Sequence, residues 1–66
     1  EYDKKADAAY IYIKYPIKDG EAIKQKSVDE NIVLDFDNKG KLLGVEVLDA
    51  SKVMNKEFLK EAKRID

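Results

Sequence analysis

Carboxylates are the main reactive groups of this sequence, which contains 14 acidic residues but no histidine and no cysteine. Paired carboxylates catalyse glycoside hydrolysis, and converging carboxylate oxygens bind hard divalent cations. The acids from which such a mechanism is conceivable are Asp3, Asp7, Asp35, Asp37, Glu46 and Asp49. Nucleophilic catalysis lacks its usual groups, because no side chain supplies an imidazole base or a thiolate. We therefore expect that the protein is not an enzyme.

The segment Asp35-x-Asp37-x-x-Gly40 is similar to the start of a calcium-binding loop, but its first residues lie inside an alternating apolar strand. Hairpin-turn chemistry explains these residues better, since Asp side chains accept hydrogen bonds from turn N–H groups and glycine adopts left-handed conformations. Asp19-Gly20 predicts a further turn. Asp3 and Asp7 fit turn or strand-end positions, and Asp49 fits a cap at the entry to a helix. We expect no metal and no cofactor.

Four lysines, Lys24, Lys26, Lys39 and Lys41, could line two strands beside Tyr10 and Tyr12, as in a single-strand nucleic-acid surface. Overall charge argues against this function, because 13 basic residues are offset by 14 acidic ones and the net charge is -1. We interpret the lysines as solvated strand surface and the tyrosines as half-buried strand residues with hydroxyls in water. No apolar run approaches the length of a membrane span, so we expect a cytoplasmic protein that binds neither nucleic acid nor membrane.

The elements that position these groups follow from hydrophobic periodicity. Residues 8–15 alternate with a period of two until Pro16 ends the strand, and residues 21–28, 32–37 and 41–48 continue the pattern. The polar segment 21–28 fits an edge strand, whose lysines discourage pairing with other chains. Tyr2-Asp3 fits the end of a further strand, and we expect residues before Glu1. The prediction is one α+β domain over residues 1–66: an antiparallel meander of four to five strands (about 2–49) and one amphipathic C-terminal helix (about 51–65).

The apolar stripe of the predicted helix consists of Met54, Phe58, Ala62 and Ile65, flanked by Leu59. Asn55 is a suitable N-cap with Glu57 in the first turn. Ser51 could instead cap a continuous helix that starts one turn earlier. The helix should pack on one face of the sheet.

Gly40 determines the predicted register of the last hairpin. A three-residue loop with Gly40 in the left-handed region opposes Asp35 to Leu43, and likewise Val33 to Val45 and Phe36 to Leu42. In this register Asp35 and Glu46 point to opposite faces. A two-residue loop would shift the pairing by one residue and exchange the faces of the fourth strand.

Three blocks of the sequence resemble a known family, called domain of unknown function 2283. The blocks are Tyr2-Asp3-x-x-x-Asp7-Ala8-x-Tyr10-Ile11, then Val28-Asp29-Glu30-x-Ile32-x-Leu34-Asp35-x-Asp37, then Gly40-Lys41-Leu42-x-Gly44-x-Glu46-x-Leu48-Asp49-Ala50-Ser51. The resemblance covers about residues 2–52 and implies a small uncharacterised prokaryotic protein. The resemblance also implies that the protein is encoded beside another small protein, in an arrangement like that of toxin and antitoxin pairs.

The apolar residues of the last hairpin indicate a partner. In the predicted register both faces are apolar, whereas a single helix can cover one of them. A chain this short has a small core, and without cysteine or histidine it lacks disulfides and the common structural metal sites, which leaves association. We expect a homodimer or small homo-oligomer, with another protein as the alternative partner. The candidate interface is Ile32, Leu34, Phe36, Leu42 and Leu48.

The predicted function is a protein–protein interaction or structural module that self-associates through its sheet. The alternatives are an antitoxin-like partner of a small toxin, a carboxylate-based enzyme and a metal-binding domain. A stoichiometric protein partner would favour the first two, whereas metal retained through dialysis would favour the last.

Overall fold

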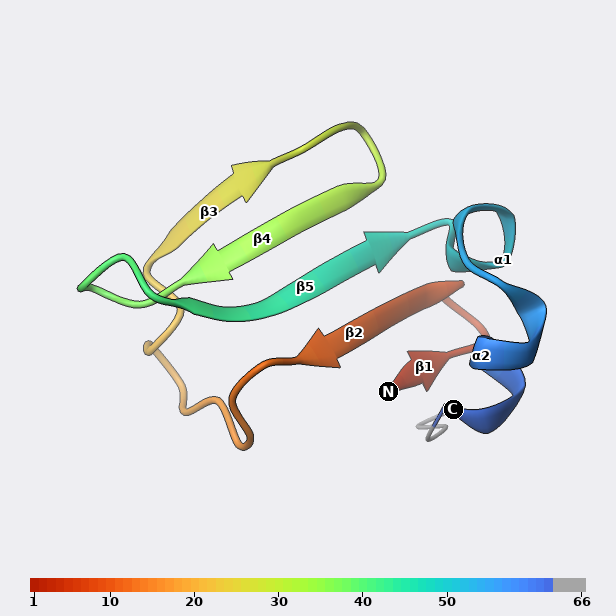
Figure 1. The fold of residues 1–66 in the computed structure, drawn as a ribbon, viewed down its shortest axis with the longest axis horizontal. Helices are drawn as coiled ribbons and strands as arrows, with labels where there is room; N and C mark the ends of the chain where they lie inside the picture. The colour runs from red at the N-terminus through yellow and green to blue at the C-terminus, as the bar shows by residue number, and fades with distance from the viewer. Residues whose placement is uncertain (63–66) are drawn as a thin grey trace.

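Five strands form one open antiparallel sheet in the order β1-β2-β5-β4-β3 (Figure 1). The structure is a computed structural model and describes residues 1–62. The strands are β1 (Tyr2–Asp3), β2 (Ala8–Tyr12), β3 (Lys24–Ser27), β4 (Ile32–Phe36) and β5 (Leu42–Leu48). Two short helices follow, α1 (Ala50–Val53) and α2 (Lys56–Glu61). The predicted α+β class and antiparallel sheet are confirmed.

The chain does not run through the sheet in sequence order. Strands β3, β4 and β5 form a meander, but β2 pairs with β5 rather than with β3. The connection over residues 13–23 therefore carries the chain past the end where β5 begins to the far edge of the sheet (Figure 1). β1 and β3 become the two edge strands.

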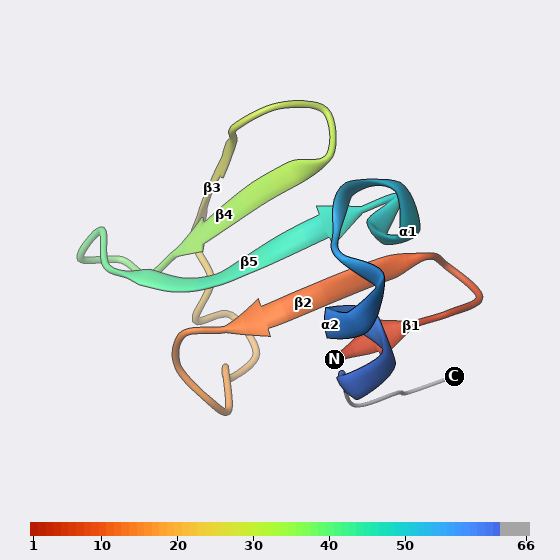
Figure 2. The ribbon, with the colours of Figure 1, turned by 45° about the vertical axis from the view of Figure 1, so that its right-hand side comes forward.

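Cross-strand register assigns every strand residue to one of two faces, because directly opposed residues point to the same side and neighbours along a strand alternate. The helix face, on which α2 lies across β1 and β2 (Figure 2), carries apolar residues from all three inner strands, β2, β5 and β4. The opposite side is called the tyrosine face. Its members from β2, β4 and β5 are Ala8, Tyr10, Tyr12, Val33, Asp35, Gly44, Glu46 and Leu48.

The core lies on the helix face, at the end of the sheet where β5 leads into α1. Its buried cluster consists of Tyr2, Ala9, Val47, Ala50 and Leu59. Both helices pack over β1, β2 and the end of β5, so within residues 1–62 no helix covers the half of the helix face over β3 and β4 (Figures 1 and 2).

The register of the last hairpin differs from the prediction. Phe36 opposes Leu42 as expected, but Asp35 opposes Gly44 and Leu34 opposes Val45, because Leu43 is an extra residue in β5. This β-bulge places Leu42 and Leu43 on the helix face, and the residues of β5 after it lie on the faces opposite to those predicted. The expectation of two apolar hairpin faces is therefore wrong. The apolar row of β4 shares the helix face with Val45 and Val47, and the other face is largely polar.

The C-terminal region contains two short helices instead of the single predicted helix. The break falls at Met54, whose backbone is extended (φ -104°, ψ 153°). Asn55 is the predicted N-cap, and its side chain accepts hydrogen bonds from the N–H groups of Glu57 (2.7 Å) and Phe58 (3.3 Å). Leu59 is the buried residue of α2, whereas Phe58 is about half exposed. The predicted stripe residue Ile65 lies outside the described residues.

The β4–β5 loop provides a direct test of backbone strain. Gly40 has φ +79°, and the Asp37 side chain accepts hydrogen bonds from the N–H groups of Lys39 and Lys41, which lower the pKa of Asp37. We expect Gly40→Val to lower the free energy of unfolding by roughly 1 kcal/mol or more, because a β-branched residue resists positive φ. Urea denaturation measures this. Gly40→Asn is the control and should lose less, since asparagine tolerates this conformation. Equal stability of wild type and Gly40→Val would contradict the prediction.

Candidate functional site

In the part of the chain that the structure describes, the helices leave an apolar surface uncovered on the helix face. β4 contributes its alternate residues, β2 and the segment directly after it contribute two isoleucines, the β3–β4 turn adds a valine, and β5 adds its first residue, a leucine. We call this set the open apolar surface: Ile11, Ile13, Val28, Ile32, Leu34, Phe36 and Leu42. Ile13 and Val28 are each 59% exposed, and the three β4 residues are only partly buried. This surface is the best candidate for contact with another molecule.

Four of the five predicted interface residues lie together on this surface, and the fifth does not. Leu48 belongs to the tyrosine face, where it opposes Ala8, and is 38% exposed. The surface also lies on the same side of the sheet as the helices, not on the helix-free side that the predicted register required. Both corrections have one cause, the extra residue Leu43.

The tyrosine face is held by a buried carboxylate. Asp35 is 6% exposed; its Oδ2 accepts the Tyr10 hydroxyl hydrogen at 2.7 Å and its Oδ1 accepts from Nε2 of Gln25 at 2.9 Å. Burial and the hydrogen bond to Asp35 raise the pKa of the Tyr10 hydroxyl. The network joins β2, β4 and β3 across the sheet. The Tyr12 hydroxyl likewise donates to Oε1 of Glu1 at 2.8 Å. The expectation that the tyrosine hydroxyls reach water is therefore wrong for both Tyr10 and Tyr12.

Gly44 creates the space in which Tyr10 lies. A Cβ at this position would be 2.6 Å from Cε2 and Cζ of the ring, closer than van der Waals contact allows. The ring of Tyr12 contacts that of Tyr10 edge to face, at a centroid distance of 4.8 Å and an interplanar angle of 64°. Tyr15 contacts Tyr12 in the same way, at 4.9 Å and 87°. Aromatic cover of a strand glycine explains why this glycine is tolerated within a strand.

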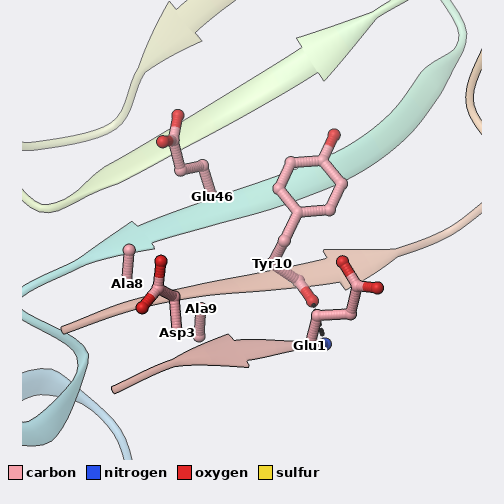
Figure 3. A pocket seen from close by; sticks show the side chains of 6 residues that line it. All are labelled: Glu1, Asp3, Ala8, Ala9, Tyr10 and Glu46. Atoms are coloured by element: carbon pink, nitrogen blue, oxygen red, sulfur yellow. Dashed lines mark hydrogen bonds between the residues drawn. The ribbon is translucent and has the colours of Figure 1, made fainter. Parts of the chain in front are cut away.

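A shallow hollow lies beside the Tyr10 ring. Figure 3 shows the side chains of Tyr10 and Glu46 on the same side of the sheet, with Asp3 of β1 and the preceding residue Glu1 nearby. The lining residues are Glu1, Asp3, Ala8, Ala9, Tyr10 and Glu46. Two of these carboxylates already accept hydrogen bonds, Glu1 from the Tyr12 hydroxyl and Asp3 from the N–H groups of Lys5 and Ala6.

The acids do not converge on one site. Asp35 and Glu46 share the tyrosine face, which corrects the prediction that they point to opposite faces. Glu46 also stands at the twelfth position of the loop that begins at Asp35, a match to the calcium-loop pattern that the sequence reading missed. Asp35 is nevertheless held by Tyr10 and Gln25, and within residues 1–62 no group of three or more acids could hold a metal ion. That the protein uses no metal, and is not an enzyme, stays a prediction.

Asp7 has a role that local sequence analysis did not find. Its carboxylate accepts hydrogen bonds from the N–H and Oγ of Ser51, at 2.9 and 2.6 Å, and from the Tyr2 hydroxyl at 2.8 Å. The Asp7 carbonyl also accepts from the N–H of Ala50 at 2.8 Å. Asp7 therefore caps α1 from the β1–β2 turn, whereas Asp49, the predicted cap, makes no side-chain capping bond there. The Ser51 and Tyr2 hydrogen bonds lower the pKa of Asp7.

The lysines do not form a stripe with the tyrosines. Lys24 and Lys26 oppose Phe36 and Leu34 and so lie on the helix face, whereas Tyr10 and Tyr12 occupy the other face. Lys14 forms the one ion pair in the described part of the chain, with its Nζ 2.7 Å from Oε2 of Glu21. Within those same residues no helix is long and apolar enough to cross a membrane.

These features define a small α+β domain with an open sheet, one apolar surface and one hydrogen-bonded polar face. The chain belongs to the family described as protein of unknown function (DUF2283), whose model matches residues 1–51. The match includes all the strands and the Asp7–Ser51 contact, and ends before α2. The chain matches no curated protein and no solved structure.

Proposed function

We propose that this domain is a protein–protein interaction module of the prokaryotic cytoplasm that self-associates by packing the open apolar surfaces of two copies together. The observation that carries the proposal is the uncovered half of the helix face. Ile32, Leu34 and Phe36 form a continuous row there, and none of them is buried within one copy.

The small core supports association. Among the described residues the buried apolar set is Tyr2, Ala9, Leu43, Val47, Ala50 and Leu59, and two of its members are alanines. Burial of a large aliphatic or aromatic side chain contributes about 1.5–3 kcal/mol, so covering the β4 row would add substantially to so small a core. Sheet-on-sheet packing of two such surfaces is a common architecture.

The surroundings of the surface also suit an interface. Lys24 and Lys26 border the β4 row on the β3 side, which gives an apolar centre with a charged rim. A toxin-like partner protein would bind the same apolar centre and is the alternative occupant. Light scattering of the purified domain distinguishes it from a second copy.

Leu42 and Leu48 provide a matched pair for testing this proposal. They are 37% and 38% exposed and lie in the same strand, but only Leu42 is on the open apolar surface. We expect the wild-type domain to be a dimer or small oligomer by light scattering across a dilution series. Leu42→Glu should be monomeric at the same concentrations and should melt at a lower temperature, because dissociation removes the stabilisation by mass action.

Leu48→Glu is the control and should keep the oligomer. A wild-type protein that is monomeric at high micromolar concentration would overturn self-association. Equal dissociation by both variants would show that the assembly does not use the open apolar surface.

A further inference from the structure

β3 is an edge strand whose outer side is free within the described chain. All four of its residues are exposed, and within residues 1–62 β4 is its one partner strand. In antiparallel pairs, residues bonded to the neighbour alternate with residues whose backbone groups point away. Val28 donates its N–H to the carbonyl of Ile32 at 2.8 Å, so the backbone of Lys26, two residues before it, also bonds to β4. The residues between them and before them, Ser27 and Gln25, therefore direct their N–H and C=O groups to the open edge.

The charge along this edge is positive and on one face. Lys24 and Lys26 both lie on the helix face, and neither forms an ion pair within residues 1–62. The other row of β3 is neutral, with Gln25 engaged by Asp35 and Ser27 next to it. An added strand would therefore meet two cations on one face and neutral polar groups on the other.

We infer that the β3 edge binds an extended acidic peptide segment of a partner protein by strand addition. Backbone groups of Gln25 and Ser27 pair with the incoming strand, and alternate acidic side chains of that strand lie opposite Lys24 and Lys26. This site goes beyond the proposed self-association, since it uses the edge of the sheet and not the open apolar surface.

A second copy of β3 is a poor occupant of this edge. In the antiparallel registers centred on the strand, Lys26 opposes either Lys26 or Lys24 of the other copy, and like charges in direct opposition are destabilising. The same lysines that prevent pairing between identical edges favour a strand of opposite charge.

The test uses the peptide acetyl-Thr-Glu-Thr-Glu-Thr-amide and backbone amide exchange measured by NMR. The acidic peptide should slow the exchange of the Gln25 and Ser27 amides by at least about tenfold at saturation, with little change at Lys26, whose amide is already bonded. Its Kd should be below about 1 mM. Measurement in both wild type and Leu42→Glu keeps the result separate from self-association.

Two controls separate strand addition from simple charge attraction. The same peptide N-methylated at its threonines keeps its charge but loses the donors, and it should not protect Gln25 or Ser27. Lys24→Glu/Lys26→Glu should weaken binding of the acidic peptide by at least about tenfold, whereas Lys4→Glu/Lys39→Glu, with the same change in net charge, should not. Absence of protection up to millimolar peptide, equal binding of the N-methylated peptide, or equal effects of the two double variants would overturn the inference.

Discussion

The Gly44→Ala variant is expected to lose about 2 kcal/mol of its free energy of unfolding, although alanine normally stabilises a strand relative to glycine. The added methyl group would overlap the Tyr10 ring, 2.6 Å from Cε2 and Cζ and also too close to the hydroxyl oxygen. The ring would have to move, and the movement would break its 2.7 Å hydrogen bond to the buried Asp35. Loss of a partner by a buried carboxylate adds to the steric cost.

A double-mutant cycle tests this explanation. In a Tyr10→Ala background the ring is absent, so Gly44→Ala should be neutral or slightly stabilising in urea denaturation. A reversal of sign between the two backgrounds is the expected result. The same loss of stability in both backgrounds would show that the Tyr10 ring is not the reason for glycine at this position.

The strands were predictable because each carries a local signal. Alternation of apolar and polar residues locates β2, β4 and β5, and the lysine-rich segment was correctly predicted to be the edge strand β3. Both signals are local, because they depend only on alternation with a period of two and on the exposure of one face of the strand. They do not specify which strands become neighbours, and the pairing of β2 with β5 was not predicted.

The register of the β4–β5 hairpin shows where local reasoning ends. Gly40 and Asp37 correctly indicate the loop, but the faces of β5 depend on the extra residue Leu43. That bulge brings Gly44 opposite Asp35 and beneath Tyr10, a contact among three strands. Because the candidate interface was derived from the faces, the same omission placed Leu48 with residues that lie on the other side.

The C-terminal helices show a related limit. Apolar spacing and the Asn55 cap predict helical structure correctly, but they also permit one continuous helix. α1 has only four residues, too few for an isolated helix to be stable, and its first N–H groups are bound by Asp7 from a turn far away in sequence. Such a contact leaves no periodic signal in the sequence.

Asp7→Asn is expected to lower the melting temperature at neutral pH and to release α1 and α2 from the sheet. The substitution removes the charge that receives the Ser51 and Tyr2 hydrogen bonds, but keeps a side chain that tolerates the positive φ of 52° at this position. Amide exchange at Leu59, the buried residue of α2, should accelerate in the variant more than exchange in β4. Asp3→Asn is the control, because the hydrogen bonds that Asp3 accepts, from the N–H groups of Lys5 and Ala6, lie within its own turn.

The difference between wild type and Asp7→Asn should depend on pH in one direction. The pKa of Asp7 in the folded protein lies below its ordinary value of 3.8, so the folded state binds the proton less readily than the unfolded state. The stabilisation is therefore fully present above the ordinary pKa and is lost as pH falls through the folded pKa. Asp37 and Glu21 also have lowered pKa values, so wild-type acid unfolding alone does not isolate Asp7. Denaturation of both proteins between pH 7 and pH 2 should show their stabilities converging in acid; a gap of constant size would mean that the ionised carboxylate is not what holds α1 to the β1–β2 turn.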